Sequence, residues 1–80
     1  MPLADEHLAY WRKNHETAIL KRISALIKAI VTDPHKGMGK PEPLKYQLSG
    51  KWSRRIDSSN RLVYSVSDNT LVIYSLRGHY

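Results

Sequence analysis

The sequence predicts an α+β fold in which two N-terminal helices pack on one face of a four-stranded antiparallel sheet. Apolar residues recur at helical spacing through residues 1–33, and the pattern changes to strict alternation in residues 44–76. The links within the alternating part are only two to four residues long, which joins antiparallel neighbours but not parallel ones. Because 80 residues leave room for one core, we expect a single domain over residues 1–80.

Each predicted helix has an apolar stripe and a definable end. The first begins at Pro2, since proline is favoured in a first helical turn, and ends near Asn14. The second begins at Thr17 and stops near Asp33, because Pro34 cannot continue the hydrogen-bond ladder. The stripes consist of Leu3, Ala4, Leu8 and Trp11 in the first helix and of Ile19, Ile23, Leu26, Ile27 and Ile30 in the second.

The second half of the chain predicts a loop followed by four short strands. Residues 34–43 contain three prolines and two glycines and are expected to form the loop. The strands are expected at Leu44–Leu48, Lys51–Ile56, Arg61–Ser67 and Thr70–Leu76. Short links of this kind are typical of an antiparallel meander.

The strand register follows from burial. If Arg55 lies opposite Arg61, nearly all large apolar residues of both strands fall on one face, whereas a shift by one residue mixes the faces. A two-residue turn at Asp68-Asn69 then adds the last strand and places Leu76 opposite Arg61. The shared face consists of Trp52, Arg54, Ile56, Leu62, Tyr64, Val66, Leu71 and Ile73.

Composition narrows the function classes. Thirteen Lys and Arg against seven Asp and Glu give a net charge of +6, which favours a polyanionic partner, although the same charge can serve solubility alone. The absence of cysteine excludes disulfides and thiolate chemistry. The first residues lack the layout of a signal peptide and no apolar run is long enough to cross a bilayer, so we expect a cytoplasmic protein with no membrane partner.

Two arginines facing each other on an open sheet face suggest an anion site. Arg55 and Arg61 repel each other unless an anion lies between them, and phosphate matches the guanidinium geometry well. The alternative is that both side chains point apart into solvent, where the repulsion is screened to under about 1 kcal/mol. The spacing alone leaves both interpretations open.

Glu42 and His79 are candidate proton-transfer groups. Pro41 and Pro43 restrict the backbone around Glu42 and hold its carboxylate in place, although most surface glutamates only solvate a loop. His79 has a side chain suited to acid–base chemistry, although it lies at a chain end, where residues are usually frayed. The other three histidines have no partner at metal-ligand spacing, so no metal site is expected. The chain also has no phosphate-binding loop for a nucleotide cofactor.

Three sequence stretches resemble one known family. They are GMGKPEPLKYQLSGKWSRRI at 37–56, NRLVYSV at 60–66 and the closing HY at 79–80. From about Leu8 to Tyr80 the chain resembles the YoeB branch of the RelE/ParE toxin superfamily, the toxin half of bacterial toxin–antitoxin pairs. In contrast to the family pattern, which starts with a β-strand, Met1 here leads almost directly into the first helix, so that strand is expected to be missing.

The resemblance implies both an activity and its residues. Family members cleave mRNA in the ribosomal A site, are neutralised by an antitoxin of the YefM kind and commonly form homodimers. Cleavage without a metal or cofactor needs a base for the ribose 2′-hydroxyl, cations for the phosphorane and an acid for the leaving 5′-oxygen, and gives a 2′,3′-cyclic phosphate. By resemblance these groups are Glu42 as base, Arg61 with Lys45 and Arg55 as cations, His79 as acid, and Tyr80 as a platform for RNA.

Two other functions remain open from the sequence. A non-catalytic RNA-binding or ribosome-binding module would use the same basic face without cutting. A ParE-like inhibitor would instead contact DNA gyrase, although Glu42, Arg61 and His79 occurring together argue against it. Mapping RNA ends after incubation with translating ribosomes, and a supercoiling assay, distinguish these two functions from the nuclease.

Overall fold

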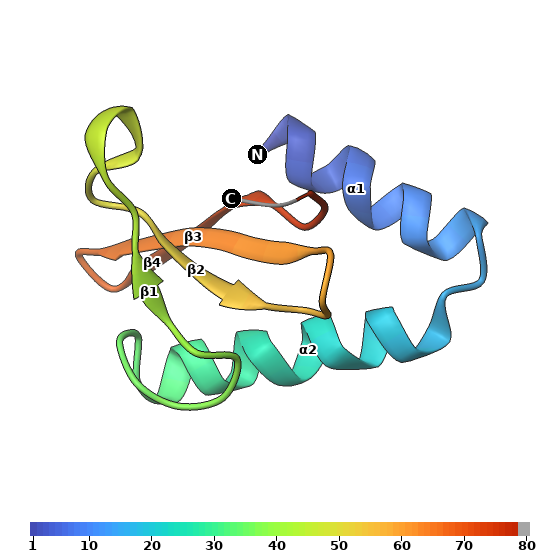
Figure 1. Cartoon of the computed structure of the whole chain (residues 1–80), viewed down its shortest axis with the longest axis horizontal. Coiled ribbons are helices and arrows are strands. Elements are labelled where there is room, and N and C mark those ends of the chain that lie inside the picture. The colour runs from blue at the N-terminus through green and yellow to red at the C-terminus, as the bar shows by residue number, and fades with distance from the viewer. Residues whose placement is uncertain (79–80) are drawn as a thin grey trace.

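A computed structural model describes residues 1–78 and confirms the α+β prediction. Two helices are followed by one antiparallel sheet in the order β1-β2-β3-β4 (Figure 1). A short 3₁₀ helix, η1, lies between the first two strands. The elements are α1 (Pro2–Lys13), α2 (Thr17–Thr32), β1 (Glu42–Pro43), η1 (Tyr46–Leu48), β2 (Trp52–Arg55), β3 (Arg61–Ser67) and β4 (Thr70–Ser75).

Both helices bury their apolar stripes against the same face of the sheet. Trp11 of α1 is buried and its indole Nε1 donates a hydrogen bond to the Leu76 carbonyl at 2.9 Å, which fixes α1 beside the end of β4. Leu3 is an exception to the predicted stripe, since it is 46% exposed at the start of α1. The buried residues of the helices and sheet form one core of Ala4, Trp11, Ile23, Leu26, Ile30, Ile56, Leu62, Tyr64 and Leu76.

The predicted register between β2 and β3 is confirmed. Arg55 lies directly opposite Arg61, and Trp52 lies opposite Tyr64. The two-residue turn at residues 68–69 is confirmed as well, with positive φ at both Asp68 and Asn69, as a tight hairpin turn of the primed type requires. Burial of one alternating face was therefore sufficient to align these strands.

The predicted position of Leu76 opposite Arg61 was wrong, because a β-bulge interrupts β4. Tyr64 pairs with Ile73 while Val63 pairs with Ser75, so Tyr74 is an extra residue. The bulge reverses the alternation after Tyr74 and brings Leu76 into the core, where it is 3% exposed. The backbone N–H of Arg61 instead donates to the Gly78 carbonyl at 3.0 Å.

The first predicted strand, Leu44–Leu48, was also wrong. Tyr46 has a φ of 58°, which no strand residue adopts, and residues 46–48 form η1. The pairing with β2 lies earlier, within the predicted loop, where Glu42 is opposite Ser53 and Pro43 is opposite Trp52. Proline is tolerated there because β1 is an edge strand whose outer side needs no donor. The change places Glu42 in the sheet.

Candidate active site

The site lies on the sheet face that the helices leave uncovered. Glu42 on β1, Ser53 on β2 and Val63 on β3 are direct neighbours across the strands, so their side chains share one face. Arg61 lies two residues before Val63 on β3 and therefore points to the same side. We refer to this surface as the outer face.

Glu42 and Arg61 approach each other across the intervening strand β2. The Glu42 Oε2 and Arg61 Nη2 atoms are 3.5 Å apart, too far for a well-formed hydrogen bond. The Glu42 side chain is 56% exposed, whereas that of Arg61 is only 8% exposed. Within residues 1–78, the buried Nε and Nη2 atoms of Arg61 have no hydrogen-bond partner. A buried guanidinium with unfilled donors is poised to accept an anion.

The loop before β1 has a backbone that positions Glu42. Gly39 has a φ of 87° and its carbonyl accepts a hydrogen bond from the Arg55 backbone N–H at 2.7 Å. A Cβ at Gly39 would lie 2.7 Å from Leu26 Cδ2, so only glycine allows this close approach. Lys40 also has positive φ, at 50°, and the chain then enters β1. Glu42 thus extends from a segment that is fixed on β2 and α2.

Arg54 binds the same loop from the core side of the sheet, a role that was not predicted from the sequence. Its side chain is fully buried, and its guanidinium donates to the carbonyls of Asp33, Lys36 and Met38 at 2.6 to 3.2 Å. Its Nε also donates to the Tyr64 hydroxyl at 3.1 Å. The sequence does contain a signal for this role, because Arg54 lies at a strand position whose neighbours on the same face are apolar.

Arg55 and Lys45, the two residues predicted to support Arg61, are exposed. Among the described residues, neither side chain makes a hydrogen bond or ion pair, so both remain available to a polyanion. A hollow of about 170 Å³ is lined by Arg55, Asp57, Ser58 and Arg61. The predicted pair of facing arginines therefore consists of one exposed and one buried guanidinium beside an open space.

Asp57 shapes the turn at this hollow. Its Oδ1 accepts hydrogen bonds from the backbone N–H groups of Ser59 and Asn60, at 2.8 and 2.7 Å. Burial alone would raise the pKa of Asp57, but these bonds and the Asn60 side-chain amide together hold the pKa below its ordinary value. Asp57 is therefore a stable anion that caps the turn.

The last described residue, Gly78, is hydrogen-bonded beside the site. The Gly78 carbonyl accepts from the Arg61 backbone, and the Gly78 N–H donates to Asn60 Oδ1 at 3.0 Å. The predicted acid His79 and the predicted platform Tyr80 lie outside the described residues. The chain is thus held beside Arg61 up to the residue that precedes His79.

His7 on α1 contacts Ser75 and Leu76, the segment that leads from β4 to Gly78. Its Nδ1 accepts a hydrogen bond from the Leu76 backbone N–H at 3.0 Å and lies 3.4 Å from Ser75 Oγ. Burial, followed by the positive charge of Arg77, lowers the pKa of His7, and Glu6 opposes the shift. A lowered pKa favours the neutral imidazole, which is the form that can accept this bond.

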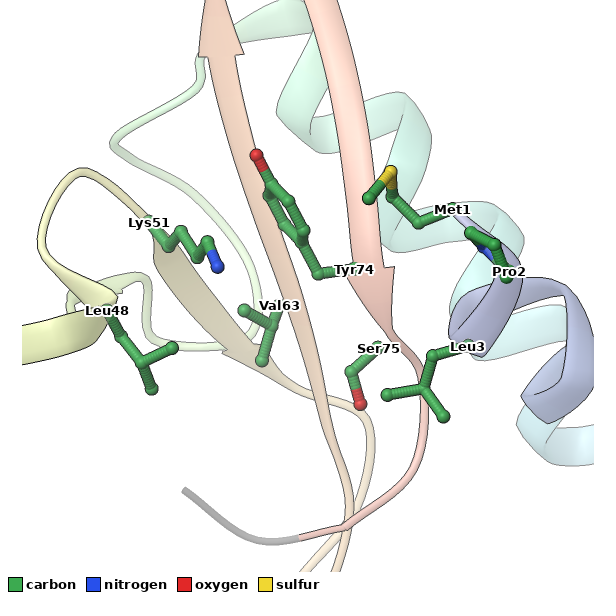
Figure 2. Close-up of a pocket in the computed structure, with 8 residues that line it drawn as sticks. All are labelled: Met1, Pro2, Leu3, Leu48, Lys51, Val63, Tyr74 and Ser75. Atoms are coloured by element: carbon green, nitrogen blue, oxygen red, sulfur yellow. The ribbon is translucent and has the colours of Figure 1, made fainter.

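An apolar hollow of about 440 Å³ lies on the outer face, away from Arg61. Figure 2 shows Val63 and Tyr74 on its floor, with Leu48 on one rim and Leu3 on the other. The Lys51 Nζ lies 4.2 Å from the centre of the Tyr74 ring. The outer face therefore offers an apolar contact surface next to the charged site.

Residues 1–78 contain no cluster of three or more histidine, cysteine, aspartate or glutamate residues that could hold a metal ion. In the same range, no helix is long and apolar enough to cross a membrane.

Comparison with known proteins identifies the family. The family model of YoeB-like toxins of bacterial type II toxin–antitoxin systems matches residues 3–80. Toxin YoeB of Synechocystis sp. is 55% identical over 74 residues, which cover 92% of this chain and 86% of the relative. Toxin YoeB of Escherichia coli K12 is 50% identical over 76 residues, covering 95% of this chain and 88% of the relative. The toxin in the solved YoeB–YefM complex from Staphylococcus aureus superposes with a TM-score of 0.91 at 42% identity, covering 100% of this chain and 92% of that one. The chain therefore belongs to the YoeB-like toxins of bacterial type II toxin–antitoxin systems.

Proposed function

We propose that this toxin is an endoribonuclease that cuts messenger RNA in the ribosomal A site without a metal ion or cofactor, and so stops translation in the cytoplasm. The observation that carries the proposal is the approach of Glu42 to Arg61 on the outer face. A carboxylate that can take a proton lies beside a buried guanidinium whose Nε and Nη2 atoms have no hydrogen-bond partner among residues 1–78. This is the combination that attack by a ribose hydroxyl on its own phosphate requires.

The reaction assigns one task to each group. The Glu42 carboxylate takes the proton of the ribose 2′-hydroxyl, and the 2′-oxygen then forms a bond to phosphorus. Arg61, with Arg55 and Lys45, stabilises the negative charge of the phosphorane. The bond from phosphorus to the 5′-oxygen breaks, and His79 gives its proton to that oxygen. The products are a 2′,3′-cyclic phosphate and a 5′-hydroxyl.

The RNA is held by charge and by aromatic contact. The net charge of +6 attracts a polyanion, and the exposed Arg55 and Lys45 are available to bind phosphates that flank the scissile linkage. Tyr80 stacks on a base next to that linkage, as aromatic side chains do in many complexes with single-stranded RNA.

The protein partners are proposed from the solved relatives. The toxin from Staphylococcus aureus is known in a complex with YefM and as a dimer. We extend both assemblies to this chain, so that a YefM-like antitoxin neutralises it and a second copy can pair with it. An acidic antitoxin segment would complement the charge of +6.

The proposal is tested by mapping RNA ends on translating ribosomes exposed to the purified protein. The wild-type chain should cut within the A-site codon and leave a 2′,3′-cyclic phosphate. Glu42→Gln should reduce the rate by roughly 10²- to 10⁴-fold, as expected for loss of a general base. Glu16→Gln, which changes an exposed carboxylate at the start of α2, is the matched control and should cut normally.

Each contrary outcome has a defined meaning. Folded Glu42→Gln protein that cuts as fast as the wild type would remove Glu42 from the mechanism. Wild-type protein that binds ribosomes but leaves the RNA intact would instead indicate a non-catalytic binding module. Inhibition of DNA supercoiling without RNA cleavage would favour the gyrase-directed function.

A further inference from the structure

Ser53 lies between the two groups of the proposed site, and its hydroxyl has no hydrogen-bond partner within residues 1–78. It is directly opposite Glu42 on one side and directly opposite Val63 on the other, with its side chain on the outer face. Ser53 is 1% exposed, and among residues 1–78 nothing hydrogen-bonds to its Oγ. Buried hydroxyls are nearly always paired in folded proteins, so an unpaired one calls for an explanation.

The position of Ser53 relative to the Glu42–Arg61 contact gives that explanation. Glu42 is on β1 and Arg61 is on β3, so the two side chains must meet across β2, the strand that carries Ser53. Directly opposed residues have Cβ atoms about 4.5–5.5 Å apart, and the Glu42 side chain is long and flexible enough to bring its carboxylate to the Ser53 hydroxyl. Ser53 is therefore a hydrogen-bond donor within reach of Glu42 that no other residue of the described chain engages.

Binding of a phosphate changes the surroundings of Glu42. The phosphate and the Glu42 carboxylate are both anions and compete for the same Arg61 guanidinium, whose contact with Glu42 is loose at 3.5 Å. Phosphate binds a guanidinium with two parallel hydrogen bonds and therefore displaces the weaker partner. Glu42 then loses its counter-charge at the moment when it must act as a base.

We propose that Ser53 donates its hydroxyl hydrogen to the Glu42 carboxylate once a phosphate has replaced that carboxylate on Arg61. One carboxylate oxygen accepts from Ser53 and stays fixed over β2, while the other takes the proton of the 2′-hydroxyl. Ser53 transfers no proton and does not touch the RNA, so it is a positioning residue. This inference rests on the proposed nuclease function and adds to it the group that holds the base.

The test compares Ser53→Ala with the wild type in single-turnover cleavage on programmed ribosomes, at several pH values. Cleavage by Ser53→Ala should be slower by roughly 10- to 100-fold at saturating ribosomes, as expected for loss of one hydrogen bond to a charged group, with little change in KM. The acidic limb of its pH–rate profile should move to higher pH, because the carboxylate is then less stabilised. Ser53→Thr, which keeps the hydroxyl, should recover most of the rate.

The matched control is Ser65→Ala. Ser65 is on β3 with its side chain on the outer face, but its Oγ is already hydrogen-bonded to the Tyr74 hydroxyl at 2.9 Å. Its loss should leave both the cleavage rate and the pH–rate profile unchanged. Urea unfolding provides a second control, since removing the unpaired hydroxyl of Ser53 should leave the stability of Ser53→Ala unchanged or slightly increased.

The outcomes separate this inference from the proposed function. If Glu42→Gln is inactive and Ser53→Ala cuts at the wild-type rate with an unmoved acidic limb, the role of Ser53 is refuted and the nuclease assignment stands. If Ser53→Ala is slow only because it unfolds at lower urea concentration, the positioning role is likewise refuted. If the wild-type protein does not cut RNA at all, the proposed function fails first, and the role of Ser53 fails with it.

Discussion

Replacing the buried Arg54 with methionine should strongly destabilise the protein. Arg54 donates four hydrogen bonds, three to carbonyls of the loop before β1 and one to the Tyr64 hydroxyl. At about 1 kcal/mol net for each hydrogen bond, Arg54→Met should lower the free energy of unfolding by roughly 4 kcal/mol. Methionine fills much of the same volume, so the loss reports the hydrogen bonds rather than a cavity.

The measurement is urea unfolding at 25 °C, followed by circular dichroism. A loss of this size is a large part of the roughly 5–15 kcal/mol that stabilises a typical domain. The midpoint of thermal unfolding should fall by about 15–30 °C, since about 1 kcal/mol corresponds to 4–8 °C in a domain of this size. Arg55→Met is the matched control, because Arg55 is the next residue but is exposed, and its stability should change by less than about 0.5 kcal/mol.

The same substitution tests how the loop positions Glu42. Once Arg54 no longer holds residues 33–38, Glu42 should shift relative to Arg61, and a displacement of about 1 Å at a reacting group can cost on the order of 10²-fold in rate. A folded Arg54→Met protein within about 1 kcal/mol of the wild type would refute the view that this arginine anchors the loop. Normal cleavage by an Arg54→Met protein that is destabilised as expected would show instead that Glu42 is positioned by its strand pairing alone.

Three further changes test separate parts of the fold. Gly39→Ala combines a strained positive φ with a Cβ only 2.7 Å from Leu26 Cδ2, so it should lower the free energy of unfolding in urea by about 2–4 kcal/mol. Gly50→Ala, its control, has the positive φ but open space around it and should lower that free energy by about 1–2 kcal/mol. The lowered pKa of His7 means that its stabilisation is complete above the ordinary histidine pKa of 6.5 and is lost as the pH falls through the native value. Unfolding free energies measured from pH 8 to pH 4 should therefore fall more in the wild type than in His7→Asn, which cannot titrate, and equal pH dependence would contradict this. Asn69→Ala places alanine at a φ of 61° and should destabilise the last hairpin by about 1 kcal/mol, while an unchanged urea midpoint would show that the turn relaxes freely.

The sequence predicted the parts of the fold that burial determines. Both helices and the β2–β3 register were correct because their apolar residues have only one arrangement that places them all in a single core. The pattern failed where few residues are buried. Leu44, Tyr46 and Leu48 alternate like a strand, yet Tyr46 is 92% exposed, so burial gave no reason to keep it in the sheet.

The location of β1 depends on tertiary contacts that a local pattern does not contain. The short strand is held by the hydrogen bond from Arg55 to Gly39 and by the carbonyls that Arg54 binds. The bulge at Tyr74 has a similar origin, since it turns Leu76 toward the core, which alternation from the preceding hairpin could not predict. Distant packing, rather than propensity, determined both features.

The candidate site was only partly accessible from the sequence. The prolines around Glu42 marked it as constrained, and the β2–β3 register placed Arg61 on the outer face, but the role of each came from the family resemblance. The contact between them required β1 to lie at Glu42–Pro43, before the predicted strand at Leu44–Leu48. Ser53 was missed because it is a small polar residue on the strand face that alternates with the apolar one, and nothing in the sequence indicates that it is buried.

Two buried arginines on adjacent strands show how the fold separates structure from function. Arg54 points to the core side, and its donors are filled by backbone carbonyls and a tyrosine hydroxyl. Arg61 points to the outer face, and its buried Nε and Nη2 have no partner among residues 1–78. Leaving donors of a buried charge unfilled costs stability, which folded proteins tolerate mainly where a ligand will fill them. If the unfilled donors of Arg61 are reserved for phosphate, inorganic phosphate should stabilise the wild type against urea more than it stabilises Arg61→Met, and equal stabilisation of the two would show that phosphate binds elsewhere.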